Sequence, residues 1–125
     1  MLGDEAIQDS DTRAFEIPVP RAPKARLEVR EPGRLSRTVD VSGPMRIGRA
    51  TESELPIKDP RVSRLHARVH ARGGHLVLTD LGSTNGTRVN GQRIREVVLG
   101  EGDVIAIGET ELVVGGRAQD DVAGV

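Results

Sequence analysis

The sequence predicts an all-β protein, an antiparallel β-sandwich of about eleven short strands. Short runs rich in Val, Ile and Leu alternate with charged residues over the region 25–116. Glycine, proline, asparagine and aspartate separate these runs at short, regular intervals, as turn residues do. We find no segment that combines helical periodicity with the capping residues of a helix.

The composition fixes what the core and the chemistry can be. A chain of 125 residues is long enough for one domain with its own core. Phe15 is the only aromatic residue, so the core must be aliphatic. The absence of cysteine excludes a disulfide framework and a thiolate metal site. A net charge of -1 gives no global attraction to nucleic acid or to a membrane.

The two ends of the chain differ from its middle. Residues 1–24 are acidic and proline-containing and lack apolar periodicity, so we expect a disordered arm before a domain at 25–116. Residues 117–125 are predicted to be a disordered tail. Thr12 and Ser10 lie among acidic residues of the arm and are candidate phosphorylation sites, although an ordinary solvated tail has the same composition. No apolar run suggests secretion or membrane insertion, and we expect a soluble, cytoplasmic monomer.

The strands follow from runs of β-branched and alternating residues. A very short strand is also expected between the two Asn-Gly pairs. The other predicted strands cover residues 26–30, 35–41, 45–47, 55–57, 65–72, 75–79, 92–94, 96–99, 103–107 and 110–114.

The segment around residues 62–72 allows two interpretations. Val62, Leu65 and Val69 are spaced as on one face of a basic helix, which would suit nucleic acid or a calmodulin-like partner. However, apolar residues alternate strictly with His and Arg from Leu65 to Arg72. Strict alternation over this length favours a half-buried strand, which is our prediction.

Residues 80–91 are the most informative stretch of the chain. They contain Asn85-Gly86 and Asn90-Gly91, and Asn-Gly is a strong signal for a tight turn because both residues accept positive φ. We therefore predict a polar loop held rigidly between strands, which displays Ser83, Thr84 and Asn85. Loops of this kind carry function on a β scaffold.

Catalysis and metal binding have little support. Ser63, His66 and Asp80 could supply a hydrolase triad, but no Gly-x-Ser-x-Gly elbow is present. The histidines have no obvious carboxylate partner for a metal site. No glycine-rich loop opens a helix to cradle a nucleotide. We predict no catalytic residue, no metal and no cofactor.

A set of loop residues instead has the positive charge and the hydrogen-bond donors that suit an anion. Arg49 and Arg64 offer rigid guanidinium forks with permanent charge, and Ser63, Thr84 and Asn85 offer neutral donors. Together they could satisfy the oxygens of a phosphomonoester. Taken singly, each could equally be a solvated or turn-forming residue.

Four blocks in this order resemble the signature of forkhead-associated (FHA) domains, over roughly residues 25–115. The blocks are Gly48-Arg49, Ser63-Arg64-Leu65-His66, Asp80-Leu81-Gly82-Ser83-Thr84-Asn85-Gly86-Thr87 and Val89-Asn90-Gly91. FHA domains are eleven-stranded β-sandwiches that bind phosphothreonine peptides through loops at one end.

The resemblance implies a role for each matching residue. It implies that Arg49 pairs with the phosphate and that Ser63 donates its hydroxyl to it. Arg64 would add a charged contact, Thr84 would contact the phosphate or the threonine methyl group, and Asn85 would hydrogen-bond the peptide backbone. Support of the binding loops is implied for Gly48, His66, Asp80, Gly86, Asn90 and Gly91.

The predicted function is a non-enzymatic, phosphothreonine-dependent protein-binding module in Ser/Thr kinase signalling. In some relatives with this domain an N-terminal threonine is phosphorylated by a Ser/Thr kinase and folds back into the protein's own site, and Thr12 is the candidate for that role here. The alternative is a phosphate-independent protein- or nucleic-acid-binding β module, although the absence of aromatic stacking platforms disfavours nucleic acid. The scarcity of aromatic residues also predicts a polar, arginine-based complement for residues that flank the phosphothreonine.

Overall fold

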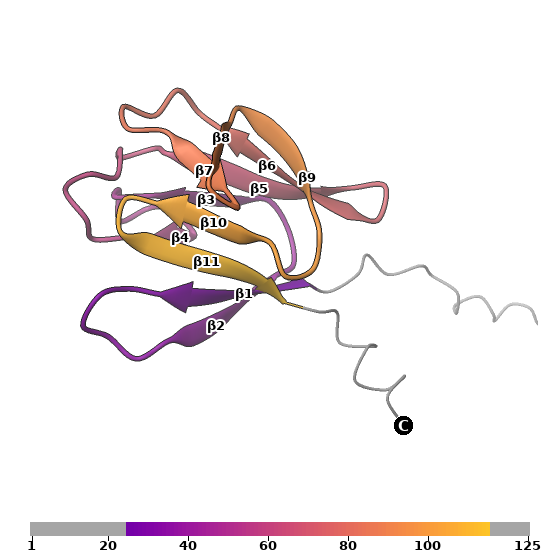
Figure 1. Cartoon of the computed structure of the whole chain (residues 1–125), viewed down its shortest axis with the longest axis horizontal. Helices are drawn as coiled ribbons and strands as arrows, with labels where there is room; N and C mark the ends of the chain where they lie inside the picture. Colours follow the sequence, from indigo (N-terminus) through magenta and orange to yellow (C-terminus); the bar gives the residue numbers. More distant parts are fainter. Residues whose placement is uncertain (1–24, 116–125) are drawn as a thin grey trace, which may run out of the picture.

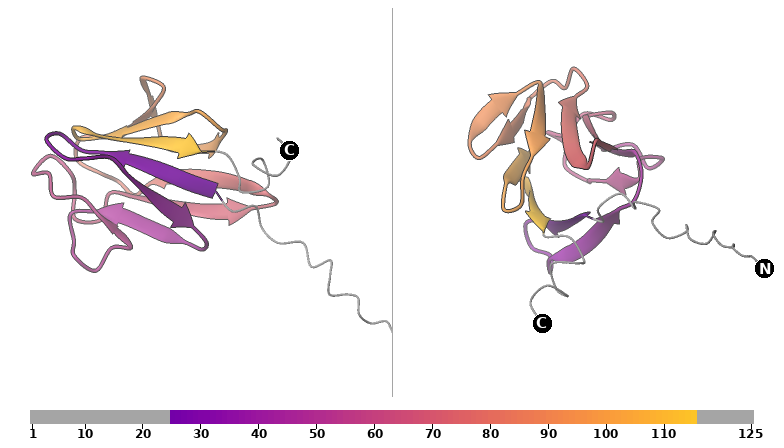
Figure 2. Two further views of the ribbon diagram at one scale, coloured as in Figure 1. Left: turned by 90° about the horizontal axis from the view of Figure 1, so that it is seen from below. Right: turned by 90° about the vertical axis from the view of Figure 1, so that its right-hand side faces the viewer.

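The computed structural model describes residues 25–115, which form a sandwich of two β-sheets (Figures 1 and 2). The predicted arm, with Ser10 and Thr12, and the predicted tail lie outside the described residues. The eleven strands are β1 (Ala25–Arg30), β2 (Arg37–Val41), β3 (Met45–Gly48), β4 (Leu55–Pro56), β5 (Ala67–Arg72), β6 (His75–Asp80), β7 (Thr87–Val89), β8 (Gln92–Ile94), β9 (Glu96–Leu99), β10 (Val104–Ile107) and β11 (Thr110–Gly115). The strand number and the sandwich architecture confirm the predicted fold class.

The first sheet has six strands in the order β2-β1-β11-β10-β7-β8, and the second has five in the order β4-β3-β5-β6-β9. Pairing is antiparallel except between β3 and β4, where Ile47 lies beside Leu55 in a parallel pair. The predicted antiparallel sandwich therefore contains one parallel pair, at this edge of the second sheet. The Glu54 carboxylate accepts the backbone N–H of Arg46 at 2.8 Å, so a side chain takes over part of the pairing here.

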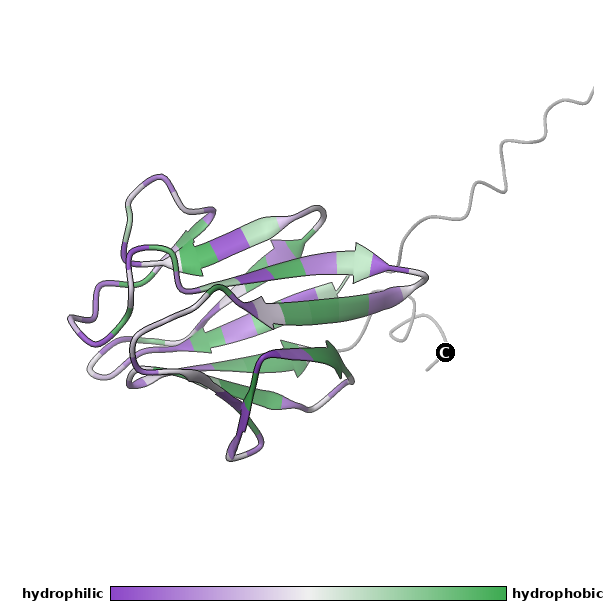
Figure 3. Cartoon of the chain, turned by 90° about the horizontal axis from the view of Figure 1, so that it is seen from above, coloured by the Kyte–Doolittle hydropathy of each residue, from purple (hydrophilic) through white to green (hydrophobic). Residues whose placement is uncertain are grey.

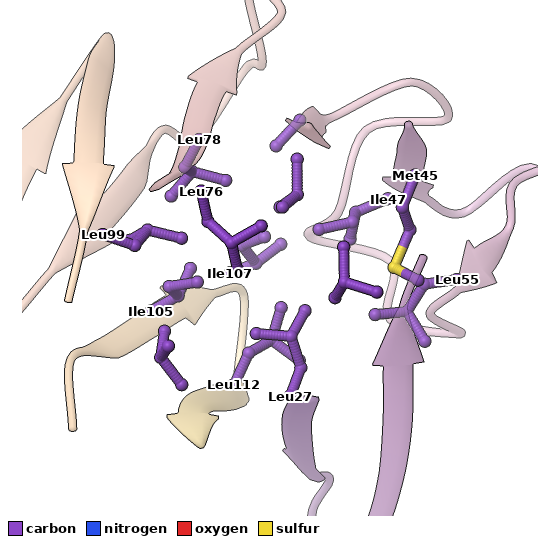
Figure 4. Packing of buried hydrophobic residues seen from close by; sticks show 14 of the residues in the cluster. Leu27, Met45, Ile47, Leu55, Leu76, Leu78, Leu99, Ile105, Ile107 and Leu112 are labelled. Atoms are coloured by element: carbon purple, nitrogen blue, oxygen red, sulfur yellow. The ribbon is translucent and has the colours of Figure 1, made fainter. Parts of the chain in front are cut away.

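The core between the sheets is aliphatic, as the sequence predicts. Leu27, Ile47, Leu78, Ile105 and Leu112 are fully buried, and they come from both sheets (Figure 4). Hydrophobic and hydrophilic residues alternate along many of the strands (Figure 3), because successive side chains of a strand point to opposite faces. Within the described residues no helix is long and apolar enough to cross a membrane.

The ambiguous segment is a strand, β5, but it begins later than predicted. Leu65 is 51% exposed and His66 is fully buried, which is the reverse of the inside-outside order that alternation from Leu65 requires. The reason is that residues 57–66 form an irregular loop, and regular alternation starts only with buried Ala67. His66 therefore occupies an interior position next to the loops.

The connections that matter for function gather at one end of the sandwich. The β3–β4, β4–β5 and β6–β7 loops lie on the left in Figure 1, together with the β1–β2 and β10–β11 connections. The β5–β6 hairpin and the start of β1 lie at the opposite end. The sheets thus hold several short loops in fixed positions around one surface.

Candidate functional site

A pocket of about 310 Å³ lies between the β3–β4, β4–β5 and β6–β7 loops. All five residues that the sequence suggests for anion binding line it. The complete lining is Arg49, Pro60, Arg61, Val62, Ser63, Arg64, Thr84 and Asn85. Segments that are far apart in the chain therefore converge on one small polar surface.

Arg49 is held by the neighbouring loop at both its backbone and its side chain. Its backbone N–H donates to the Ser63 carbonyl at 2.9 Å, and its Nε donates to the Val62 carbonyl at 2.9 Å. Among the described residues neither of its Nη groups has a hydrogen-bond partner. The guanidinium is therefore oriented by one edge and keeps its other edge for a ligand.

Gly48 allows this close approach of two backbones. A Cβ atom at this position would collide with the Arg64 carbonyl oxygen. The Gly48 carbonyl in turn accepts the N–H of Ile57 at 2.8 Å. Only glycine leaves the space that lets the β3 end pack directly against the β4–β5 loop.

Ser63 joins the β4–β5 and β6–β7 loops. Its Oγ accepts the backbone N–H of Thr84 at 3.0 Å. Within the described part of the chain the Ser63 hydroxyl hydrogen has no acceptor, so it remains available to a ligand in the pocket.

His66 lies behind the pocket and contacts both loops. Its Nδ1 accepts the Ser63 backbone N–H at 3.1 Å, which places the ring proton on Nε2. Nε2 lies 3.0 Å from the Gly86 carbonyl and donates to it. The neutral ring therefore fixes the spacing of the two loops from a fully buried position.

Asp80 organises the β6–β7 loop from inside. Its carboxylate accepts the Ser83 hydroxyl at 2.6 Å, the Thr87 hydroxyl at 2.7 Å and two backbone N–H groups, those of Gly82 and Ser83. Burial alone would raise the pKa of Asp80, but the bonds from Ser83, Thr87 and the backbone outweigh it and lower this pKa below its usual value. Ser83 therefore belongs to the loop scaffold, and the expectation that it is displayed beside Thr84 and Asn85 is wrong.

Asp80 should make the stability of the domain depend on pH. Because its pKa is lower in the folded state, its contribution is complete above the unfolded pKa of about 3.9 and is lost as the pH falls through the folded value. At pH 7 we expect Asp80→Asn to lower the free energy of unfolding by about 1–3 kcal/mol, the cost of unsatisfied donors. Denaturant titrations of the wild type and the variant between pH 7 and 3 should show that the difference in their free energies of unfolding becomes smaller as the pH falls. A difference that stays constant would contradict the role of the Asp80 charge.

Asn85 is positioned by a residue that the sequence did not single out. Its Nδ2 donates to the Arg61 carbonyl at 2.8 Å, so its Oδ1 and second N–H remain for a ligand. Arg61 itself pairs with Glu109 at 2.8 Å and with the buried Asp59 at 3.5 Å. The Asp59 carboxylate also accepts the backbone N–H groups of Glu109 and Arg61, which lower its pKa. This network anchors the β4–β5 loop to the β10–β11 turn.

Asn90 and Gly91 do not support the pocket, contrary to the expectation from the sequence. They form the β7–β8 turn with φ values of 52° and 84°, at the other end of these strands from the β6–β7 loop. The Asn90 side chain accepts the N–H of Val104 and donates to Asp103, both at 3.0 Å. They stabilise the start of β10 instead.

Comparison with known proteins places the domain in a family. The model of the FHA domain family matches residues 45–108. FhaA of Mycobacterium tuberculosis, an FHA domain-containing protein, is 41% identical over 68 residues, 54% of this chain and 13% of the relative. The glycogen accumulation regulator GarA of Mycolicibacterium smegmatis is 41% identical over 66 residues, 53% of this chain and 42% of the relative. The chain thus spans less than half the length of these relatives.

Solved structures agree with this placement. One similar structure comes from a structural and functional analysis of phosphothreonine-dependent FHA domain interactions. It superposes on this domain with a TM-score of 0.65 and 33% sequence identity, and the match covers 74% of this chain and 95% of the other chain. Fold and pocket together define a β-sandwich binding domain whose loops carry the site. The chain belongs to the FHA domain family, and its described domain is a binding domain rather than an enzyme.

Proposed function

We propose that the domain binds phosphothreonine peptides in the pocket between the three loops. The observation that carries this proposal is the convergence of unpartnered donors. The Nη groups of Arg49, the Ser63 hydroxyl and the free amide hydrogen of Asn85 belong to residues that line the same pocket. No acidic side chain lines it. A dianionic phosphate is the ligand that this donor set complements.

Each side chain then has a distinct role. Arg49 pairs with the phosphate through its free edge, and Ser63 donates its hydroxyl to a phosphate oxygen. Arg64 adds a second positive charge at the exposed rim. Thr84 contacts the phosphate or the threonine methyl group, and Asn85 hydrogen-bonds the peptide backbone beside the phosphothreonine.

The partner class follows from this chemistry. The ligand is a protein phosphorylated on threonine, which requires a Ser/Thr protein kinase, and we place both in the cytoplasm. The similar structure from the study of phosphothreonine-dependent FHA domain interactions supports this class of ligand. The domain would act as a reader of the kinase's product.

Thr12 is part of the same proposal as a regulatory phosphorylation site. Twelve residues lie between Thr12 and Ala25, so the 13 Cα-to-Cα steps of an extended chain could span at most about 45 Å. The start of β1 lies at the end opposite the pocket, and a six-residue strand is about 20 Å long. The arm is therefore long enough to bring phosphorylated Thr12 into the domain's own pocket, where it would exclude other peptides.

The test is a degenerate phosphothreonine peptide library compared with matched threonine and phosphoserine libraries, with affinities of selected peptides measured by calorimetry. Loss of charge-assisted hydrogen bonds worth about 2 kcal/mol or more predicts at least about 30-fold weaker binding of the threonine forms. If the threonine methyl group is buried, phosphoserine should bind about fourfold more weakly, from about 0.8 kcal/mol per methyl group. Equal affinities with and without phosphate would favour the phosphate-independent module instead.

A further inference from the structure

Two arginines face each other on the β7–β8 hairpin. Arg88 and Arg93 are directly opposite in the antiparallel register, so their side chains lie on the same face. Both are exposed, on the outer side of the first sheet, while Thr87 beside Arg88 points into the interior. Like charges at directly opposite positions destabilise a strand pair. We therefore ask which interaction of the two arginines compensates for this loss of stability.

No acidic residue of the described chain compensates this pair. Neither arginine has an ion pair among residues 25–115. On the other side of Arg88 lies Ala106 of β10, and Glu111, one strand further, lies between Ala106 and Arg30. The Asp80 carboxylate, at the same end of the sandwich, is occupied by its own loop.

Arg93 also lies against the pocket's own loop. A Cβ atom on Gly86 would be 2.7 Å from Arg93 Nε and 2.9 Å from its Cζ, so the guanidinium packs on the Gly86 backbone. Gly86 has a φ of 90° and follows Asn85 directly. The positive charge of Arg93 is therefore built into the edge of the β6–β7 loop, one residue beyond a pocket residue.

We propose that Arg88 and Arg93 form a second anion subsite, which takes an additional phosphate or carboxylate of the same bound peptide. This inference rests on the proposed phosphothreonine site. A peptide held by Asn85 advances about 3.3 Å per residue when extended, so an anionic group a few residues from the phosphothreonine could reach the pair. Guanidinium forks suit both phosphate and carboxylate oxygens.

The experiment uses the full chain and a positional library of phosphothreonine peptides. One flanking position at a time carries aspartate, phosphoserine, asparagine or serine, and affinities are compared for wild type, Arg88→Gln/Arg93→Gln and Arg72→Gln. Arg72 is a matched control because it is an exposed arginine on β5, near the β5–β6 hairpin at the far end. The double variant removes both charges without touching a pocket residue.

The wild type and the control should prefer aspartate over asparagine, and phosphoserine over serine, about two- to fivefold at one or two positions, as exposed ion pairs allow. The double variant should lose this preference while binding uncharged peptides within about twofold of wild type. A preference for phosphoserine alone would identify a phosphate subsite, and a preference for both would identify a subsite for either anion.

Two results would contradict the proposed second anion subsite. The double variant could keep the same acidic preference, or it could bind every peptide equally more weakly, which would mean that Arg93 only braces Gly86. Failure of the primary site is distinguishable, because binding would then not depend on threonine phosphorylation in any of the proteins.

Discussion

Replacing Arg49 with alanine is expected to weaken phosphothreonine peptide binding by about 2–5 kcal/mol, roughly 30- to several-thousandfold. Truncation would remove the guanidinium edge that faces the ligand and leave a phosphate with its charge only partly compensated. The fold should survive, because the backbone N–H of Arg49 still bonds to the Ser63 carbonyl. Calorimetry with a library-selected peptide measures the loss.

Two further variants test whether binding depends on the guanidinium geometry of Arg49 and on the position of its charge. Arg49→Lys keeps the positive charge but lacks the fork geometry, so its affinity should fall between those of wild type and Arg49→Ala. Arg68→Ala removes an exposed arginine from β5, outside the pocket lining, and should leave binding unchanged. If Arg49→Ala binds as tightly as wild type, Arg49 does not contact the phosphate.

Replacing His66 with alanine should have the largest effect on stability, about 3–5 kcal/mol in the free energy of unfolding. The ring is fully buried, so its removal leaves a cavity behind the pocket. It also leaves the Ser63 N–H and the Gly86 carbonyl without their buried partner. Because small domains are stable by only about 5–15 kcal/mol, this loss should be obvious in denaturant unfolding.

The same variant should bind phosphopeptides more weakly even where it is folded. Without the ring, the loops that carry Ser63 and Asn85 lose the contact that sets their spacing. His75→Ala is the control, because His75 is exposed at the β5–β6 hairpin and should change stability by less than about 0.5 kcal/mol. A loss below about 1 kcal/mol for His66→Ala would show that the ring does not brace the loops.

Most of the fold could be predicted because its signals are local. Alternation such as Arg26-Leu27-Glu28-Val29-Arg30 indicates a strand by itself, and most of the turns between strands contain glycine, proline or asparagine. The exception is the parallel pairing of β4 with β3, which is accompanied by a hydrogen bond between Arg46 and Glu54, eight residues apart. Such a contact leaves no periodic pattern in the sequence.

Residue type and spacing together single out Arg49, Ser63 and Asn85, and the structure brings these three residues to one pocket. The sequence does not single out Arg61, because its contact with Asn85 uses the backbone carbonyl, which every residue has. The sequence does not distinguish Ser83 from its neighbours Thr84 and Asn85, which have similar polarity, and only the fold turns the Ser83 hydroxyl to Asp80.

Long-range pairing explains the remaining differences. Asn90 and Gly91 are close in sequence to the β6–β7 loop, but β7 carries them to the opposite end of the β7–β8 hairpin. The Arg88–Arg93 pair is visible only once the register of the hairpin is known. Sequence distance is therefore a poor guide to distance from the pocket.

The most direct test is an amide and arginine Nε NMR titration of the domain with one library-selected peptide, with and without phosphate on its threonine. The phosphorylated form should shift the signals of residues 49–50, 61–64 and 84–86 and the Nε signal of Arg49, while the unphosphorylated form leaves them in place. Shifts confined to the β5–β6 end of the sandwich, or identical shifts with both forms, would show that these loops do not form a phosphothreonine pocket.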